Sequence, residues 1–152
     1  MNEIKTILVT TDFSDTSNKA FPIARGLAEK YDARIVLAFV EEDRLPPLVL
    51  EYTDIGIEEI VKRQHQRASS QLLRIGKEQF GSLDVETKAI SGIPHLEIVQ
   101  IAEEVQADLI VMATHGRGFI SHAILGSTTE RVVRRAPCPV LVVRDAVQQK
   151  EG

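Results

Sequence analysis

Hydrophobic residues in this chain fall into two alternating patterns, short continuous runs and helix-spaced stripes. A short apolar run bounded by polar or glycine residues is typical of a strand that is buried on both faces. Such runs predict five strands, over residues 4–10, 34–40, 85–90, 108–112 and 140–143. The stripes between the runs predict helices, so strand and helix alternate through the sequence.

The first helix has a start signal and an internal conflict. We expect Ser14 to cap it, because a serine hydroxyl accepts a hydrogen bond from a free N–H of the first turn. Pro22 would then lie beyond the first turn and should bend the helix. In a later helix Pro94 fits the first turn, where its missing N–H costs nothing.

The longest stripe predicts a helix over residues 54–79, ended by Gly81. His65 falls on this stripe, and we expect it to be partly buried rather than a metal ligand, because no second ligand lies at metal spacing. The apolar positions of the stripe are Ile57, Val61, Ala68, Leu72 and Ile75.

These patterns predict an α/β fold: one domain with an open, doubly wound sheet of five parallel strands and helices on both faces. We expect the domain to span residues 1–146 and residues 147–152 to form a flexible tail. Ligands of such sheets bind outside the carboxyl ends of the strands. Small or polar residues follow three of those ends, at residues 10–12, 91–92 and 113–116.

The composition argues against several classes of binding partner. A hydrophobic content of 43% and a charged content of 26% are ordinary for a globular domain, and a net charge of −4 argues against a general nucleic-acid binder. No apolar run approaches the ~18 residues of a membrane span. The single cysteine, Cys138, excludes an internal disulfide and is expected to be a structural thiol. With no signal peptide visible, we expect a cytoplasmic protein that contacts neither membrane nor nucleic acid.

The strongest chemical signal follows the predicted strand at residues 108–112. It begins with Ala113-Thr114-His115-Gly116-Arg117-Gly118 and continues, after a spacer, to Gly126-Ser127-Thr128-Thr129 at a helix start. Strand, glycine-bearing loop and helix N-terminus are typical of phosphate sites, because backbone N–H groups and the helix dipole point at the anion. Ordinary turn and cap chemistry is the alternative. We predict that Ser127 caps this helix and that Glu130 completes a capping box.

Other polar residues at these strand ends allow more than one role. Asp12 is either an acceptor for a ribose hydroxyl or an adenine amino group, or a turn aspartate before the helix. Arg117 is either a cation that reaches a phosphate or a solvated side chain. His115 has no carboxylate partner visible, and no Walker loop, dinucleotide fingerprint or Ser-His-Asp set occurs. The residues support binding, and no catalytic or metal-ligating residue is assigned.

At these positions the chain resembles a universal stress protein over nearly its whole length. The resemblance rests on residues 7–14, ILVTTDFS, on residues 92–98, GIPHLEI, on residues 107–112, ADLIVM, on the glycine loop, and on residues 137–143, PCPVLVV. It implies the strand order 3-2-1-4-5 and a homodimer that pairs the last strands of two copies. The paired residues would be Val140, Leu141, Val142 and Val143.

The resemblance also implies a ligand. Family members that bind ATP carry a glycine, two residues, a second glycine, nine residues, and then Gly-Ser or Gly-Thr. This chain matches at Gly116 and at Gly126-Ser127 but has Ala113 at the first glycine. The resemblance therefore implies a pocket for ATP, accompanied by Mg²⁺, that is altered by one methyl group. Its residues would be Thr10, Thr11, Asp12, Val40, Ala113, Thr114, His115, Gly116, Arg117, Gly118, Gly126, Ser127, Thr128 and Thr129.

Three functions stay open. The favoured one is a dimeric stress-response protein that binds ATP and acts as a nucleotide-sensing module. The second is a nucleotide-free dimer that acts through protein contacts, favoured by Ala113 and by the apolar Leu48-Val49-Leu50 in the irregular segment 41–53. The third is slow ATP hydrolysis, for which the sequence offers no clear base or nucleophile.

Overall fold

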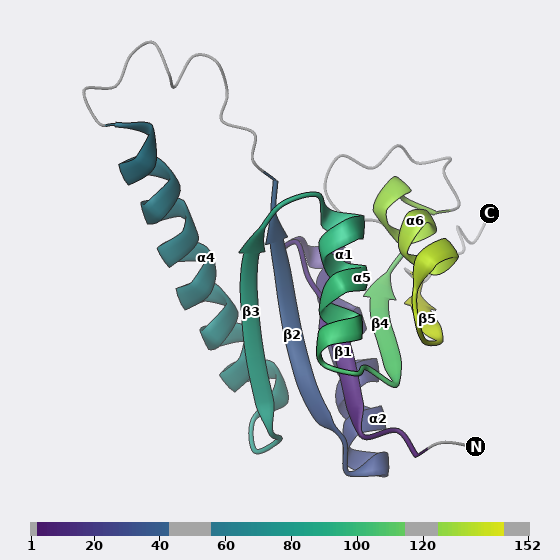
Figure 1. Cartoon of the computed structure of the whole chain (residues 1–152). Coiled ribbons are helices and arrows are strands. Elements are labelled where there is room, and N and C mark those ends of the chain that lie inside the picture. The colour runs from purple at the N-terminus through teal and green to yellow at the C-terminus, as the bar shows by residue number, and fades with distance from the viewer. Residues whose placement is uncertain (1–2, 43–55, 115–124, 145–152) are drawn as a thin grey trace, which may run out of the picture.

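The fold is built on a parallel sheet of five strands, seen in a computed structural model that describes residues 3–42, 56–114 and 125–144. The order is β3-β2-β1-β4-β5, and each neighbouring pair runs parallel (Figure 1). Fold class and strand order are therefore confirmed. The strands are β1 (Thr6–Thr10), β2 (Arg34–Glu41), β3 (Val85–Ser91), β4 (Leu109–Ala113) and β5 (Val140–Val143).

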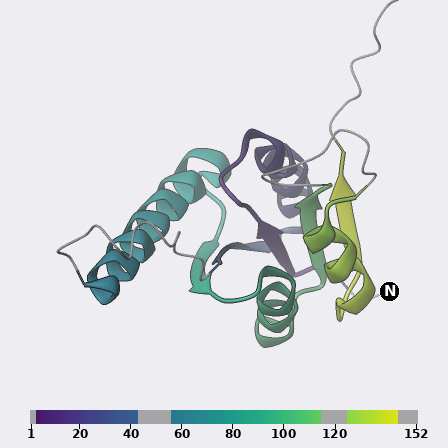
Figure 2. The same cartoon turned by 90° about the horizontal axis from the view of Figure 1, so that it is seen from above.

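Helices cover both faces of the sheet. One layer contains α2 and α4, and the opposite layer contains α5 and α6; Figure 2 shows α2 and α5 on opposite sides of the strands. This two-sided cover explains why the central strands β1 and β4 are largely continuous apolar runs, whereas the outer strand β3 carries polar residues and has no fully buried position. The described helices are α1 (Asp15–Asn18), α2 (Ala20–Tyr31), α4 (Ile57–Phe80), α5 (Pro94–Glu104) and α6 (Ser127–Arg135).

Each central strand divides its side chains between two cores. In β1, Ile7 and Val9 pack in the α2–α4 core, whereas Leu8 packs in the α5–α6 core. All three are fully buried. In the first core the rings of Phe21 and Phe80 meet edge to face, with centroids 5.7 Å apart, and join α2 to α4. The alternation follows from the strand's period of two.

The prediction that Pro22 bends one long first helix is wrong. Ser14 does cap a helix, since its hydroxyl accepts from the N–H of Ser17 at 3.2 Å, but this helix ends at Asn18. A second helix begins at Ala20, after Lys19. Pro22 is thus in a first turn, where its missing N–H has no partner to lose.

The long helix is shorter and more exposed at its start than predicted. It runs from Ile57 and ends at Gly81, whose φ of 50° confirms the glycine stop. Ile57 is 53% exposed and Val61 38%, and His65 is exposed, so the expected burial of that histidine is wrong. The reason is visible in Figure 1, where the first turns of α4 extend past the tips of β2 and β3. The sheet covers the stripe only from Ala68 onward.

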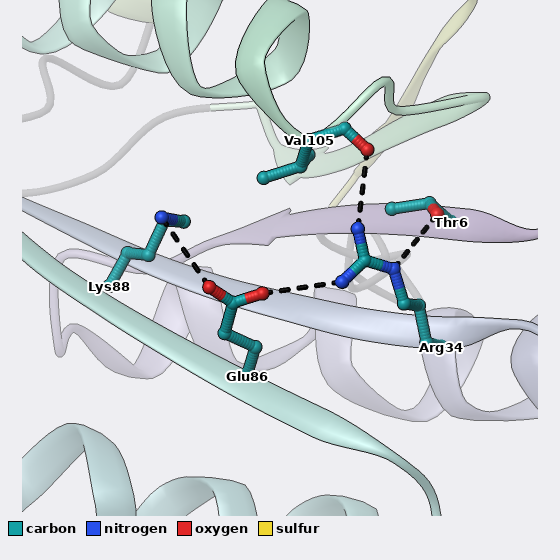
Figure 3. A network of polar contacts seen from close by, with 5 residues as sticks. All are labelled: Thr6, Arg34, Glu86, Lys88 and Val105. Atoms are coloured by element: carbon teal, nitrogen blue, oxygen red, sulfur yellow. Dashed lines mark hydrogen bonds and ion pairs between the residues drawn. The ribbon is translucent and has the colours of Figure 1, made fainter.

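At the amino ends of the strands, here called the amino edge of the sheet, Arg34 of β2 joins three neighbouring elements (Figure 3). Its Nε donates to Thr6 Oγ1 at 3.1 Å, and its Nη2 to the Val105 carbonyl at 3.3 Å. Its Nη1 donates to Glu86 Oε2 at 3.3 Å, and Lys88 Nζ lies 3.4 Å from the other oxygen of that carboxylate. The network fixes β1, β2, β3 and the end of α5 against one another.

Asp108 makes a second tie at the amino edge. Its Oδ2 accepts from the backbone N–H groups of Lys5 at 2.9 Å and Thr6 at 3.0 Å. Its own N–H donates to the Thr6 carbonyl at 2.9 Å. The start of β1 is thereby held beside the start of β4.

Candidate functional site

The structure brings two predicted groups of residues together at the carboxyl ends of neighbouring strands, here called the carboxyl edge of the sheet. Thr10 and Thr11 lie at the end of β1, and Ala113 and Thr114 at the end of β4, which pairs with β1. All four are buried, with exposures of 8%, 6%, 6% and 3% in that order. Val40 lies near the end of β2 on the other side of β1, and its side chain is half-buried against the α5–α6 core.

The turn after β1 is an ordered set of side-chain hydrogen bonds. Asp12 Oδ1 accepts from both the N–H and the hydroxyl of Ser14, so the turn-aspartate alternative is realised for this oxygen. Thr11 Oγ1 shares a 3.0 Å hydrogen bond with Ser17 Oγ and accepts from the N–H of Phe13 at 3.0 Å. These bonds fix the chain that borders the carboxyl edge.

Phe13 adopts an unusual backbone conformation in this turn. Its φ is 67°, in the left-handed region that phenylalanine rarely occupies. Its ring packs on Phe39 of β2 with centroids 4.3 Å apart, and this contact helps hold the strained turn. Strained residues that the surrounding fold holds in place cluster at functional sites. The sequence carried no signal for this strain.

The N-terminus of α6 is anchored directly to the end of β4. The Gly126 N–H donates to the Thr114 carbonyl at 2.7 Å, and the buried Thr129 Oγ1 donates to the Ala113 carbonyl at 2.9 Å. The Thr114 N–H in turn donates to the Val143 carbonyl at 3.1 Å. This anchoring sets the first turn of α6 at the carboxyl edge, close to the end of β1.

The predicted capping box at this helix is wrong. Gly126 is the N-cap and provides no side-chain hydrogen bond, while Ser127 is already the first helical residue and is exposed. Glu130 instead pairs with Arg134 one turn later, at 2.8 Å. The N-cap residue of α6 therefore supplies no side-chain acceptor to the first-turn N–H groups, and an anion placed there would meet backbone donors and the positive end of the helix dipole.

Four of the predicted site residues lie outside the described part of the chain. They are His115, Gly116, Arg117 and Gly118. The apolar Leu48-Val49-Leu50 and the predicted tail 147–152 lie outside it as well. Of the remaining site residues, Thr128 is half-buried in the first turn of α6.

The pKa values of two described side chains, His95 and Cys138, depart from their ordinary values. His95 lies in the first turn of α5; its partial burial and, after that, the Arg131 and Arg135 guanidinium groups lower its pKa. Cys138 lies away from the carboxyl edge, at the start of the segment leading into β5. Burial, and then the charge of Asp108, raise the pKa of its thiol, which suits a structural cysteine better than a reactive one.

One residue at this edge was not singled out from the sequence. The structure extends β2 by one residue beyond the predicted end, to Glu41. Its Oε2 is buried, and within the described residues it has no hydrogen-bond partner. An acidic residue directly after an apolar run was the available signal, the same signal that drew attention to Asp12.

Two classes of feature are absent from the part of the chain that the structure describes. No group of three or more His, Cys, Asp or Glu side chains is placed to hold a metal ion. No helix there combines the length and the apolar character needed to cross a bilayer.

Comparison with known proteins decides the family. Residues 3–144 match the family model described as the universal stress protein family. The chain belongs to the universal stress protein family. The universal stress protein MJ0531 of Methanocaldococcus jannaschii is 36% identical to it over 146 residues, which cover 94% of this chain and 84% of that relative.

Solved structures agree with this assignment. The structure of MJ0577, also from Methanocaldococcus jannaschii, superposes with a TM-score of 0.82 at 32% identity and covers 95% of this chain and 98% of that one. A universal stress protein solved in complex with cAMP superposes with a TM-score of 0.62 at 26% identity, covering 94% of this chain and 98% of that one. The fold thus carries a nucleotide in at least one family member.

Proposed function

We propose that this universal stress protein binds ATP at the carboxyl edge of β1 and β4 and acts as a dimeric stress-response module that senses the nucleotide. The observation that carries the proposal is the N-terminus of α6, which has a glycine N-cap and is anchored to the end of β4 through Gly126 and Thr129. Free backbone donors at a helix N-terminus suit a phosphate group. The cAMP complex of a family member supports a nucleotide as the ligand.

The residues divide between the two ends of the nucleotide. The first turn of α6, at Gly126, Ser127 and Thr128, would hold phosphates together with Gly116 and Arg117 of the sequence motif. Thr10, Thr11, Asp12 and Val40, at the ends of β1 and β2, would border the adenosine. His115 and Gly118 would complete the loop.

Ala113, the departure from the ATP-binding motif, is compatible with this arrangement. Strand alternation places its methyl group on the same face as Val111, which packs in the α2–α4 core. The residue is only 6% exposed, so little of it faces a ligand. Its carbonyl still accepts from Thr129, and this bond anchors α6 whatever the side chain.

Mg²⁺ would reach the site with the phosphates. The described residues supply no cluster of ligands that could form a metal cage on its own. Mg²⁺ commonly binds through substrate phosphates and water with one or two protein oxygens, so this donor set fits the ion.

The dimer would form at β5, which lies at the edge of the sheet. Val140, Leu141, Val142 and Val143 form an apolar edge strand, and Leu141 is 37% exposed. Unpaired apolar edge strands favour pairing with another chain. Leu141→Lys should therefore yield monomers in sedimentation, whereas the exposed Ile57→Lys on distant α4 should leave the dimer intact.

Calorimetric titration of nucleotide-stripped protein with ATP tests the function. We expect binding in the wild type and a loss of about 100-fold or more in Gly126→Val, because a side chain there blocks approach of a phosphate to the backbone. Gly126 has φ −65° and ψ 157°, which any residue adopts, so circular dichroism should show an intact fold. No heat at millimolar ATP would overturn the proposal.

Gly26→Val is the matched control for this titration. Gly26 is exposed on α2, and nothing lies within 4 Å of a Cβ added there, so ATP affinity should not change. Phosphate release by the wild type above that of Gly126→Val would instead favour the slow ATPase. The nucleotide-free alternative would be favoured if mass spectrometry found no nucleotide in freshly purified protein.

A further inference from the structure

Glu41 occupies a fixed position at the carboxyl edge of the sheet. It is the last residue of β2, and it pairs in register with Ser91 of β3. Its carbonyl accepts from the N–H of Gly92 at 2.9 Å. The backbone of Glu41 is therefore as well ordered as the strand that carries it.

The side chain of Glu41 is anomalous in its hydrogen bonding. Oε2 is buried, and it is the one buried side-chain oxygen or nitrogen without a partner among the described residues. Buried polar groups in folded proteins are almost always hydrogen-bonded, because removing them from water without a new partner is unfavourable. We therefore expect Glu41 Oε2, an acceptor without a partner, to serve a function at this edge.

Strand alternation shows which way Glu41 lies. Phe39 packs with the α2–α4 core and Val40 with the α5–α6 core, so Glu41 lies on the Phe39 face. On that face Phe39 stacks on Phe13 in the turn after β1. The side chain of Glu41 thus lies on the same face of the sheet as the contact between Phe39 and Phe13.

The N-terminus of α6 and the side chain of Glu41, both at the carboxyl edge, need opposite hydrogen-bonding partners. The first turn of α6, attached to β4, offers backbone donors and requires an acceptor. Glu41, on β2, offers an acceptor and requires a donor. Because β1 lies between β2 and β4, about 10 Å separates these two strands. Glu41 and α6 lie on opposite faces of the sheet, so a ligand that meets both crosses the sheet beyond the end of β1.

We propose that Glu41 is a specificity-determining residue whose Oε2 accepts a hydrogen bond from the nucleoside part of the bound nucleotide. The donor is the exocyclic amine of the base or a ribose hydroxyl. A phosphate is repelled from this position, so Glu41 also sets the direction in which the nucleotide lies. The inference rests on the proposed nucleotide site and adds the group that recognises the nucleoside end.

Titrations with four nucleotides test this assignment. The wild type, Glu41→Gln and Glu42→Gln are each titrated with ATP, with inosine triphosphate, which lacks the amine, and with the 2′-deoxy and 3′-deoxy forms of ATP. We expect the wild type to bind one analogue about 10-fold more weakly than ATP, and that analogue identifies the donor. Glu41→Gln should lose a similar factor for ATP but not for that analogue.

Glu42→Gln is the matched control, since Glu42 is the exposed neighbour of Glu41 and should leave every affinity unchanged. In the absence of nucleotide, Glu41→Met should unfold at a temperature equal to or a few degrees above the wild type, because it removes an unsatisfied buried oxygen. A lower unfolding temperature would show that the carboxyl group has a structural partner and would overturn the inference.

The remaining outcomes separate the two proposals. If the wild type binds ATP and Glu41→Gln discriminates among the four nucleotides as the wild type does, the role of Glu41 is refuted and the nucleotide site stands. Equal losses for all four nucleotides in Glu41→Gln refute it too. If the wild type binds none of them, the nucleotide site itself is refuted, and the role of Glu41 with it.

Discussion

The two edges of the sheet use polar residues in opposite ways. At the amino edge, Arg34 and Asp108 are surrounded by partners: Arg34 donates to three groups and one oxygen of Asp108 accepts from two backbone N–H groups. At the carboxyl edge, Glu41 Oε2 has no partner among the described residues, and the N-cap of α6 is Gly126, which has no side chain to cap the helix. The polar groups of the amino edge hold neighbouring strands together, and we propose that those of the carboxyl edge bind a ligand.

The two edges should respond differently to substitution. A saturated polar network stabilises a structure, whereas a buried group without a partner lowers stability unless something binds to it. Substitutions at the amino edge should therefore change the free energy of unfolding and leave nucleotide affinity alone. Substitutions at open groups of the carboxyl edge should do the reverse.

Substitution of Gly92 should have the largest effect on the free energy of unfolding. Gly92 lies at the carboxyl edge, so this edge also contains a residue that matters for stability. Its φ is 154°, and a Cβ added there would lie 2.6 Å from Glu97 Oε1 and 2.7 Å from Glu97 Cγ. We expect Gly92→Ala to lower the free energy of unfolding by about 3 kcal/mol in urea titrations. Adding Glu97→Ala should restore the steric part of that loss.

Gly26→Ala is the control for Gly92→Ala. Gly26 lies in a helix with open space around a new Cβ, and alanine there should raise stability by about 1 kcal/mol. A loss of equal size at both glycines would contradict the steric and conformational argument.

Asp108→Ala tests the amino edge, where the polar groups have hydrogen-bond partners. It leaves the N–H groups of Lys5 and Thr6 without their acceptor, so we expect a loss of about 2 kcal/mol in the free energy of unfolding. Asp108→Asn, which keeps one side-chain oxygen, should cost less. Calorimetry should give the same ATP affinity for both variants, and a change of affinity at constant stability would break the contrast between the edges.

A smaller effect compares two helix starts. Ser14 caps α1 through the N–H of Ser17, so Ser14→Ala should cost about 1 kcal/mol. Ser127 is exposed and caps nothing, so Ser127→Ala should change stability by less than about 0.3 kcal/mol. Equal losses in thermal unfolding would mean that Ser127 does form the cap expected from the sequence.

The smallest expected effect is on the pH dependence of stability, through His95. His95 has a folded-state pKa below its unfolded value of 6.5, so the unfolded chain binds more protons and stability falls as the pH drops below about 6.5. Arg131→Gln should raise the pKa of His95 in an NMR titration and reduce this acid loss. Arg134→Gln is the control, because Arg134 pairs with Glu130 and is not a cause of the shift. An unchanged pKa in Arg131→Gln would count against this account.

Features that depend on neighbours in the chain were predictable from the sequence. Apolar runs predicted the buried strands, because a strand covered on both faces has few polar positions, although the outer strand β3 is polar at several positions. Gly81 and Pro94 marked a helix end and a helix start through backbone rules that act locally. The strand order came from the resemblance to universal stress proteins, since pairing partners are distant in sequence.

Other features depend on residues that are distant in the sequence and could not be predicted from it. His65 has helical spacing for burial but is exposed, because the buried positions of α4 begin only at Ala68. Ser127 matches a capping box, yet the anchoring of Gly126 to Thr114 begins the helix one residue earlier. Glu41 has an ordinary local sequence, and its burial without a partner arises only from its place at the end of β2. Local patterns in the sequence thus set the elements and indicated the family, whereas the packing of distant elements decided which polar groups find partners and which do not.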